Sequence, residues 1–203
     1  GTLGATLADG LPISLNTPVT AVDYSGDGVQ VETAKGTIHA KACLVTVSVG
    51  VLAAEKIKFT PALPVEKQQA ISDIPMGLLM KVPLMFDGAR LERGENNWVT
   101  YELSTEHAGE GCFFVSWPCG WDYTMGFIGG PFAWDLYAQG QDAVVDYALG
   151  ELVRCVGSDA RKHFKGGYAS DWADNPNTLV AYGAVRPGTY GARSILGAPV
   201  DDK

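Results

Sequence analysis

Short runs of apolar residues predict several β-strands in the N-terminal part of the chain. Residues 29–33 alternate between apolar and polar, which is typical of a strand with one face in water. Residues 13–15, 19–24 and 37–40 form similar short runs, and the glycine-bearing stretch 23–28 supplies the turn before residues 29–33. The pattern therefore predicts a small sheet built around a hairpin.

Two longer apolar runs follow, and both predict buried strands. Residues 42–47 are almost wholly apolar, which indicates a central strand covered on both faces. Residues 76–86 form the second run, which is interrupted only by Lys81. Three further runs have the spacing of an antiparallel meander, at residues 98–103, 112–117 and 123–128.

Helical spacing is clearest at residues 143–156, where the apolar residues fall on one face. Asp142 is expected to cap the start of this helix, and Gly157 to end it. Pro64 is expected to open a shorter helix over residues 64–71. A helical turn is also expected in residues 1–11. Separate strands and helices of this kind predict an α+β fold with a mixed, largely antiparallel sheet flanked by helices.

Lys81 is the main candidate for chemistry, because it interrupts an apolar strand. An ammonium inside such a strand costs free energy unless it is hydrogen-bonded or reaches water. A desolvated lysine also loses its proton more readily, which suits it to positioning water or assisting proton transfer. The alternative is a lysine at a strand edge with its amine in solvent.

Composition narrows the classes of function. With 46% hydrophobic residues, the 203-residue chain can bury a core as one large domain or two small ones. The net charge of -8 and the scattered basic residues predict no nucleic-acid partner, and favour a cationic substrate over an anionic one. The cysteines and histidines lack metal-ligand spacing, so free thiols and no metal site are expected. No apolar stretch has the length of a membrane span.

Four segments, taken in order along nearly the whole chain, resemble the flavin-dependent amine oxidases, the family of the monoamine and polyamine oxidases. The segments are Leu15-Asn16-Thr17-Pro18-Val19 with the hairpin after it, residues 42–64, residues 76–86 around Lys81, and Trp172-Ala173-Asp174-Asn175-Pro176 with Ala181-Tyr182 and Arg186-Pro187-Gly188. Ser48 departs from the proline that is usual in the second segment, which puts the turn there in doubt.

The resemblance implies roles for four positions. Val19 is similar to the residue whose backbone meets the FAD adenine, and Lys81 to the lysine that holds a water near the flavin. Trp172 and Tyr182 resemble aromatic residues near the flavin and the substrate, with Tyr182 as one wall of a cage around the substrate amine. An aromatic face suits an amine because it is electron-rich. On their own evidence, Val19 is an ordinary strand residue and the two aromatics are core or rim residues.

A complete FAD site needs a glycine-rich turn that opens a helix. Its nearest approach is Gly26-Asp27-Gly28, but Val31 stands where the third glycine is required, and the segment leads into a predicted strand. We therefore expect the central part of a larger flavoprotein. Residues 1–60 would pack on an FAD domain, 61–170 would form the substrate-binding domain, and 171–203 would return toward a C-terminal FAD motif.

The predicted function is substrate binding in an FAD-dependent amine oxidoreductase that acts on a small-molecule amine. The chain alone is expected to lack activity, to bind FAD weakly at most, and to self-associate through uncovered apolar surface. One alternative is another flavoprotein oxidase or desaturase of the same superfamily, which Lys81 and Tyr182 make less favourable. The other is a non-catalytic ligand-binding domain. The identity of the amine, the electron acceptor and the compartment stay open.

Overall fold

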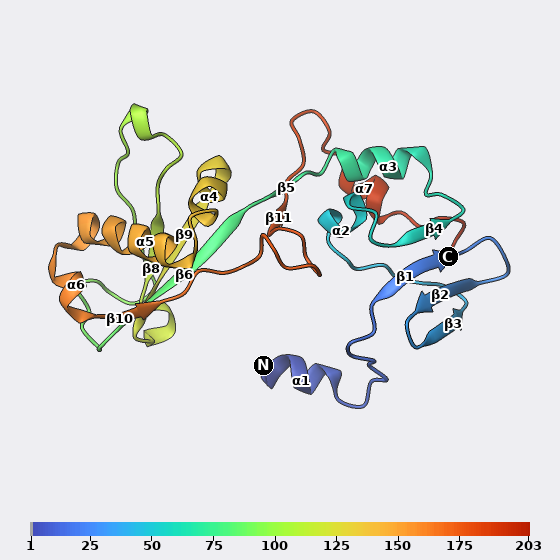
Figure 1. Cartoon of the computed structure of the whole chain (residues 1–203), viewed down its shortest axis with the longest axis horizontal. Coiled ribbons are helices and arrows are strands. Elements are labelled where there is room, and N and C mark those ends of the chain that lie inside the picture. Colours follow the sequence, from blue (N-terminus) through green and yellow to red (C-terminus); the bar gives the residue numbers. More distant parts are fainter. Residues whose placement is uncertain (1) are drawn as a thin grey trace.

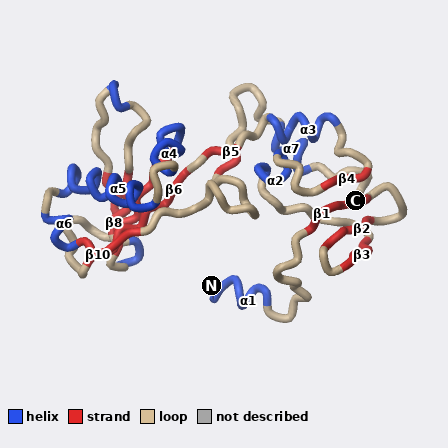
Figure 2. Tube along the Cα trace, in the orientation of Figure 1, coloured by secondary structure: helices blue, strands red, loops and turns tan. Residues whose placement is uncertain are grey.

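Two lobes make up the computed structural model, which describes residues 2–203 (Figure 1). A narrow link joins them, formed by the antiparallel strands β5 (Met76–Gly77) and β11 (Tyr182–Gly183). The regular elements gather in the two lobes, while loops surround the link (Figure 2). Helix α1 (Thr2–Ala8) has no buried residues and lies apart from both sheets.

The first lobe combines a four-stranded sheet with three short helices. Its strands lie in the order β3-β2-β1-β4, and only the β1–β4 pair is parallel. The elements are β1 (Val19–Asp23), β2 (Val29–Thr33), β3 (Gly36–Ala40), β4 (Lys58–Thr60), α2 (Val49–Ala53), α3 (Val65–Ser72) and α7 (Ala192–Gly197). Helices α3 and α7 share a small core of Ala70, Ile74 and Ala192, so residues far apart in sequence close this lobe.

The second lobe is a five-stranded antiparallel sheet in the order β10-β6-β9-β8-β7. Its strands are β6 (Leu79–Phe86), β7 (Asn97–Val99), β8 (Phe113–Ser116), β9 (Tyr123–Gly129) and β10 (Phe164–Gly167). Its helices are α4 (Gly130–Tyr137), α5 (Gln141–Val156) and α6 (Asp159–His163), with 3₁₀ turns at Thr105–His107 and Pro118–Gly120.

One face of this sheet carries the main core. Successive side chains of a strand point to opposite faces, and β6 alternates accordingly between buried and more exposed positions. Met80, Val82 and Leu84 are fully buried in one cluster with Ala133 of α4 and Ala148 of α5. The helices therefore cover one face of the sheet, and the opposite face is left open.

The structure confirms the predicted α+β class with a largely antiparallel sheet. The meander appears as β7-β8-β9, β2 has the predicted bounds, and the predicted long helix is α5. Gly140 rather than Asp142 occupies the N-cap position of α5, whereas Gly157 ends it as expected. Helix α3 packs in the first lobe, so residues 61–75 lie with the N-terminal sheet and not with the five-stranded one.

The predicted strand at residues 42–47 is wrong. This segment is irregular, and the Leu44 side chain is 88% exposed. The Cys43 N–H donates to the Lys203 carbonyl, but no described strand pairs with the segment. An apolar run becomes a central strand only when neighbouring strands lie on both sides, and the described sheet of this lobe supplies none there. The strand expected at residues 13–15 is also absent from the described structure.

Candidate functional site

The open face of the five-stranded sheet is the candidate site. The register places Lys81 of β6 directly opposite Phe127 of β9, and Phe127 directly opposite Phe113 of β8. Residues directly opposite each other in an antiparallel pair project from the same face. Lys81, Phe127 and Phe113 therefore form one row across the sheet, on the face away from the helices.

Three aromatic rings cluster at one end of this row. The rings of Phe113 and Phe127 are stacked, with centroids 5.0 Å apart and an interplanar angle of 9°. The Trp98 ring, on the neighbouring strand β7, lies 5.7 Å from Phe113 and 6.1 Å from Phe127. Trp98 is 66% exposed and Phe113 38% exposed. We call Trp98, Phe113 and Phe127 the aromatic patch; it offers apolar ring surface next to Lys81.

Lys81 is exposed, which corrects the prediction that its strand is buried on both faces. On one side Lys81 pairs with Phe127 of β9; on the other it meets Ser170, because β10 pairs only with residues 84–86 of β6. Its backbone is fixed by Ser170, which follows β10. The Lys81 N–H donates to the Ser170 hydroxyl over 2.9 Å, and the Ser170 N–H donates to the Lys81 carbonyl over 3.0 Å.

Backbone contacts bring the segments of Lys81, Trp172 and Tyr182 together. Trp172 follows Ser170 by two residues, and its carbonyl accepts from the Val180 N–H over 3.0 Å. Tyr182 pairs with Gly77, four residues before Lys81. These backbone contacts connect the Lys81, Ser170–Trp172 and Tyr182 segments in a closed circuit, which begins and ends at the link between the lobes. Both aromatic side chains are exposed.

The Trp172 segment is also held by helix α4. The Tyr137 hydroxyl donates to the Asp174 carboxylate over 2.8 Å. This hydrogen bond, with burial and the nearby Asp171 charge, raises the pKa of Tyr137 to about 12. The phenol therefore stays protonated and keeps the bond at neutral pH.

Between Trp172 and Tyr182 the backbone takes an unusual conformation. Leu179 has φ 44° and Val180 has φ 86°, and this left-handed region is unfavourable for a β-branched residue. A residue keeps such a strained backbone conformation only where contacts with the surrounding structure hold it there. Here Ser48, the N-cap of α2, donates from its hydroxyl to the Thr178 carbonyl. The residue that departs from the family pattern thus holds this segment.

We expect Ser170→Ala to loosen the contact between Lys81 and the segment after β10, because the variant loses the hydroxyl that accepts from the Lys81 N–H. Amide hydrogen exchange at Lys81 should then accelerate by about fivefold, as expected for a lost bond of roughly 1 kcal/mol. Ser170→Thr keeps the hydroxyl and should preserve slow exchange. Equal exchange rates in all three proteins would show that the Ser170 hydroxyl does not hold the strand.

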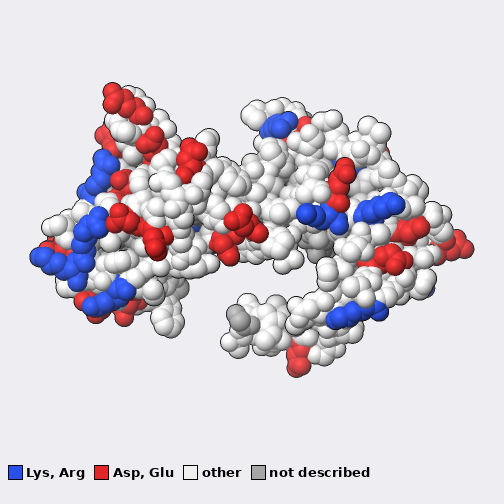
Figure 3. Space-filling view, in the orientation of Figure 1, with Lys and Arg blue, Asp and Glu red and all other residues white. Residues whose placement is uncertain are grey.

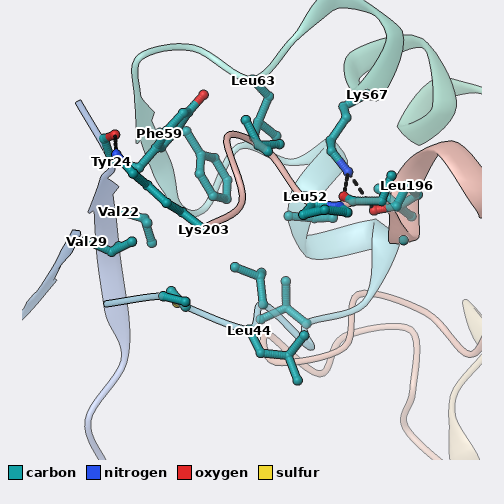
Figure 4. Close-up of a pocket in the computed structure, with 18 residues that line it drawn as sticks. Val22, Tyr24, Val29, Leu44, Leu52, Phe59, Leu63, Lys67, Leu196 and Lys203 are labelled. Atoms are coloured by element: carbon teal, nitrogen blue, oxygen red, sulfur yellow. Dashed lines mark hydrogen bonds between the residues drawn. The ribbon is translucent and has the colours of Figure 1, made fainter. Parts of the chain in front are cut away.

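Val19 does not join this group of residues. It lies on β1 in the first lobe, half-buried against the core of Val22, Val29 and Ile57. The same lobe contains an apolar cavity of about 460 Å³ between the sheet, residues 42–47 and the segment after α7 (Figure 4). Lys67 and Lys203 line it, but their ammonium groups donate to backbone carbonyls. The cavity therefore offers mainly apolar surface.

The described residues do not provide a complete FAD cradle. A pyrophosphate needs close glycine backbone and a helix N-terminus after a strand. The glycines at positions 26 and 28 instead connect β1 to β2. No group of three or more His, Cys, Asp or Glu side chains in residues 2–203 is placed to hold a metal ion. No helix in that part of the chain is long and apolar enough to cross a bilayer.

None of the four cysteines lies on strands β6 to β9, which form the open face. All four are free thiols, as expected from their spacing. Cys112 projects from the helix-covered side, and burial raises the pKa of its thiol to about 12. On the side of the molecule seen in Figure 3, basic and acidic residues are interspersed. Ion pairs in the described structure include Lys162 with Asp159.

Sequence reasoning missed the aromatic patch and Ser170. The meander was predicted, but its register was not, and only the register shows which aromatic residues share a face with Lys81. Alternation in residues 123–127, where Thr124 and Gly126 separate the larger Tyr123, Met125 and Phe127, was the available signal. The Ser170 contact has no such signal, because it joins a hydroxyl to a backbone amide 89 positions away.

The second lobe is thus a helix-backed antiparallel sheet whose open face carries Lys81 and the aromatic patch. Comparison with known proteins identifies the family to which the chain belongs. Residues 1–198 match the family model described as flavin containing amine oxidoreductase. The chain therefore belongs to the flavin-containing amine oxidoreductase family, as the resemblance of the four segments predicted.

Relatives of the chain include two plant proteins that match it over nearly its whole length. The chain is 31% identical to polyamine oxidase 4 of Oryza sativa subsp. japonica, over 97% of this chain and 40% of that protein. It is 30% identical to lysine-specific histone demethylase 1 homolog 3 of Arabidopsis thaliana, over 97% of this chain and 13% of that protein. The chain thus spans less than half the length of these relatives.

Solved structures agree on the fold. A redesigned triple mutant of putrescine oxidase superimposes with a TM-score of 0.70 at 19% identity, covering 91% of this chain and 40% of that one. Cyclohexylamine oxidase from Brevibacterium oxydans IH-35A gives a TM-score of 0.69 at 24% identity, covering 90% and 40%. The two-lobe arrangement is therefore a fold shared with amine oxidases.

Proposed function

We propose that this chain supplies the substrate-binding face of an FAD-dependent amine oxidoreductase, which oxidises an amine C–N bond to an imine. The observation that carries the proposal is the open sheet face, where Lys81 lies beside the aromatic patch and is tied through Ser170 to the Trp172 and Tyr182 segments. Family membership supports the same reaction class.

Each proposed residue has a role that its chemistry allows. The Lys81 ammonium is a strong donor that can hold a water molecule, and its exposure leaves it available on the open face. The rings of Trp172 and Tyr182 can orient an amine against an electron-rich surface. Val19 is proposed to meet the adenine through its backbone. The flavin, when bound, supplies the acceptor for the hydride.

Lys81→Met in a flavoprotein that contains this chain tests the catalytic role. The variant keeps the length of the side chain but removes the donor, so turnover or the reaction of reduced flavin with oxygen should slow by about tenfold or more. Lys162→Met on α6 is the matched control, since Lys162 is exposed and lies on the helix side. A protein indifferent to Lys81→Met would instead be a non-catalytic ligand-binding domain.

The isolated 203-residue chain is expected to hold little FAD and to oxidise no amine, because its described residues lack the pyrophosphate cradle. The measurement is an absorbance spectrum of the purified chain after dialysis from excess FAD, with the flavin released by denaturation and quantified. Free FAD treated in parallel gives the baseline. Flavin bands with one FAD per chain would overturn this expectation.

Self-association stays a prediction for the isolated chain. The exposed apolar residues in 42–47, led by Leu44, and the open cavity beside them offer uncovered surface. Light scattering across a range of concentrations tests it, and a constant monomeric mass at high concentration would count against it.

A further inference from the structure

Helix α2 of the first lobe is in direct contact with the segment that leads to Tyr182. The Ser48 hydroxyl donates to the Thr178 carbonyl, and the same hydroxyl accepts from the Val51 N–H over 3.1 Å. One side chain therefore caps α2 and holds Thr178. Because these two residues are 130 positions apart, the contact ties the N-terminal part of the chain to the segment that returns to the link.

Gly50, two residues further along the chain, allows this close approach. A Cβ added at Gly50 would overlap the Leu179 carbonyl oxygen, and it would lie 3.1 Å from the Leu179 Cβ and 3.2 Å from the Thr178 oxygen. Gly50 is helical, so the requirement is one of space and not of backbone conformation. Any side chain at this position would push the facing segment away from α2.

The facing segment takes a conformation that is costly by itself. Leu179 and Val180 both have positive φ, which is unfavourable for residues with a Cβ and most of all for a β-branched one. The Thr178 hydroxyl is buried without a hydrogen-bond partner in residues 2–203. The shape of this segment therefore depends on contacts from outside it, and α2 supplies two of them.

The same segment carries the backbone directly into Tyr182. The Val180 N–H donates to the Trp172 carbonyl over 3.0 Å. The Ala181 N–H donates to the Gly77 carbonyl over 3.3 Å, and Tyr182 pairs with Gly77 in the link. The Tyr182 side chain is 54% exposed, so packing of its ring does little to fix it. Its position is therefore set by the backbone that leads to it.

We infer that Ser48 and Gly50 are positioning residues for Tyr182 in the proposed amine oxidation. The inference rests on the proposed function and deepens it, because it makes α2 of the first lobe responsible for placing one aromatic wall of the amine site. Both residues act through the backbone of residues 178–181 and not by contact with the amine.

Amide hydrogen exchange in the 203-residue chain tests the contact without flavin. Ser48→Ala should speed exchange at Val180 and Ala181 about fivefold or more, whereas Ser48→Thr keeps the hydroxyl and should leave exchange slow. Ser48→Asp should also speed exchange, because an ionised carboxylate can cap α2 but has no proton to donate to Thr178. Ser158→Ala is the matched control, since Ser158 is the exposed N-cap of α6 and its side chain makes no capping bond.

Gly50→Ala tests the same contact from the other side. Alanine is a better helix former than glycine, so α2 by itself would be stabilised, but the added methyl group would displace Leu179. Exchange at Val180 should therefore rise about fivefold or more. Gly150→Ala in α5 is the matched control, because the nearest atom to its added Cβ is the Arg161 Nη2 at 3.7 Å, an ordinary contact.

A double-mutant cycle in a flavoprotein that contains this chain tests the positioning role, with spermidine and benzylamine as the amine probes. Tyr182→Ala and Ser48→Ala should each lower kcat/KM about tenfold, and Ser48→Thr should restore most of the loss. In the Tyr182→Ala background, Ser48→Ala should change kcat/KM by less than about twofold, because the ring through which it acts is already missing. A merely structural role would lower kcat/KM equally in both backgrounds.

Unchanged exchange at Val180 in the Ser48→Ala and Gly50→Ala variants would overturn the inference, and so would equal kinetic losses in the two backgrounds. The two proposals fail separately. If Lys81→Met and Tyr182→Ala slow turnover but Ser48→Ala is silent or additive, only the positioning role is wrong. If Ser48→Ala speeds exchange but Lys81→Met and Tyr182→Ala are silent, the oxidase role is wrong and the positioning role falls with it.

Discussion

Phe114→Ala should lower the free energy of unfolding of the second lobe by about 3–5 kcal/mol. Phe114 is 0% exposed and projects from β8 into the core under helices α4 and α5. Truncation removes buried apolar surface and leaves a cavity that a packed sheet cannot close. Urea unfolding followed by far-ultraviolet circular dichroism measures the change.

The adjacent residue provides the control. Phe113→Ala removes the same number of atoms from the same strand, but from the open face, and should cost at most about 1 kcal/mol. The two variants should therefore separate stability from amine binding, since only Phe113 belongs to the aromatic patch. Equal losses of stability would mean that the two faces of the sheet are not as different as the structure shows.

Lys67→Met should lower the free energy of unfolding of the first lobe by about 3 kcal/mol. Lys67 is only 7% exposed, and its ammonium donates to the carbonyls of Ile195 and Leu196, each over 3.0 Å, and of Ala198. Methionine fills a similar volume but donates nothing, so the carbonyls at the end of α7 lose their partner in a buried place. Thermal unfolding and hydrogen exchange in α3 and α7 report the effect.

Lys56→Met is its matched control, because Lys56 is exposed just after α2 in the same lobe. That variant should unfold within about 0.5 kcal/mol of the unchanged protein. If both lysine variants behave alike, then the Lys67 ammonium does not clamp α7 to α3, and the closure of the lobe must rest on the small cluster around Ala70.

Periodicity predicted those elements whose two faces differ. Helix α5 has an apolar stripe and β2 alternates, so both were placed correctly. Lys81 was assigned to a buried strand because Leu79, Pro83 and Met85, on the open face, are as apolar as the core residues between them. A strand covered on both sides and a strand with an apolar ligand-binding face give the same pattern of letters.

Only those site residues that lie in the segments resembling the family were predicted from the sequence. Lys81, Trp172 and Tyr182 were named from their motifs, and the structure brings their backbones into one ring; their roles stay predictions. The aromatic patch exists because the strand register places its three residues on one face. Residues 42–47 do not form a strand because no neighbouring strand pairs with them. Both are properties of pairing between distant segments, which local composition does not encode.

The narrow link between the lobes has a mechanical consequence. Tyr182 lies on the link itself, whereas Lys81 belongs to the rigid sheet beyond it. A few residues at such a junction can absorb large changes of φ and ψ, so a rotation of one lobe against the other would be concentrated there. A rotation of the lobes about this link would change the separation of the Tyr182 phenol and the Lys81 ammonium, the two groups that we propose to lie at the amine.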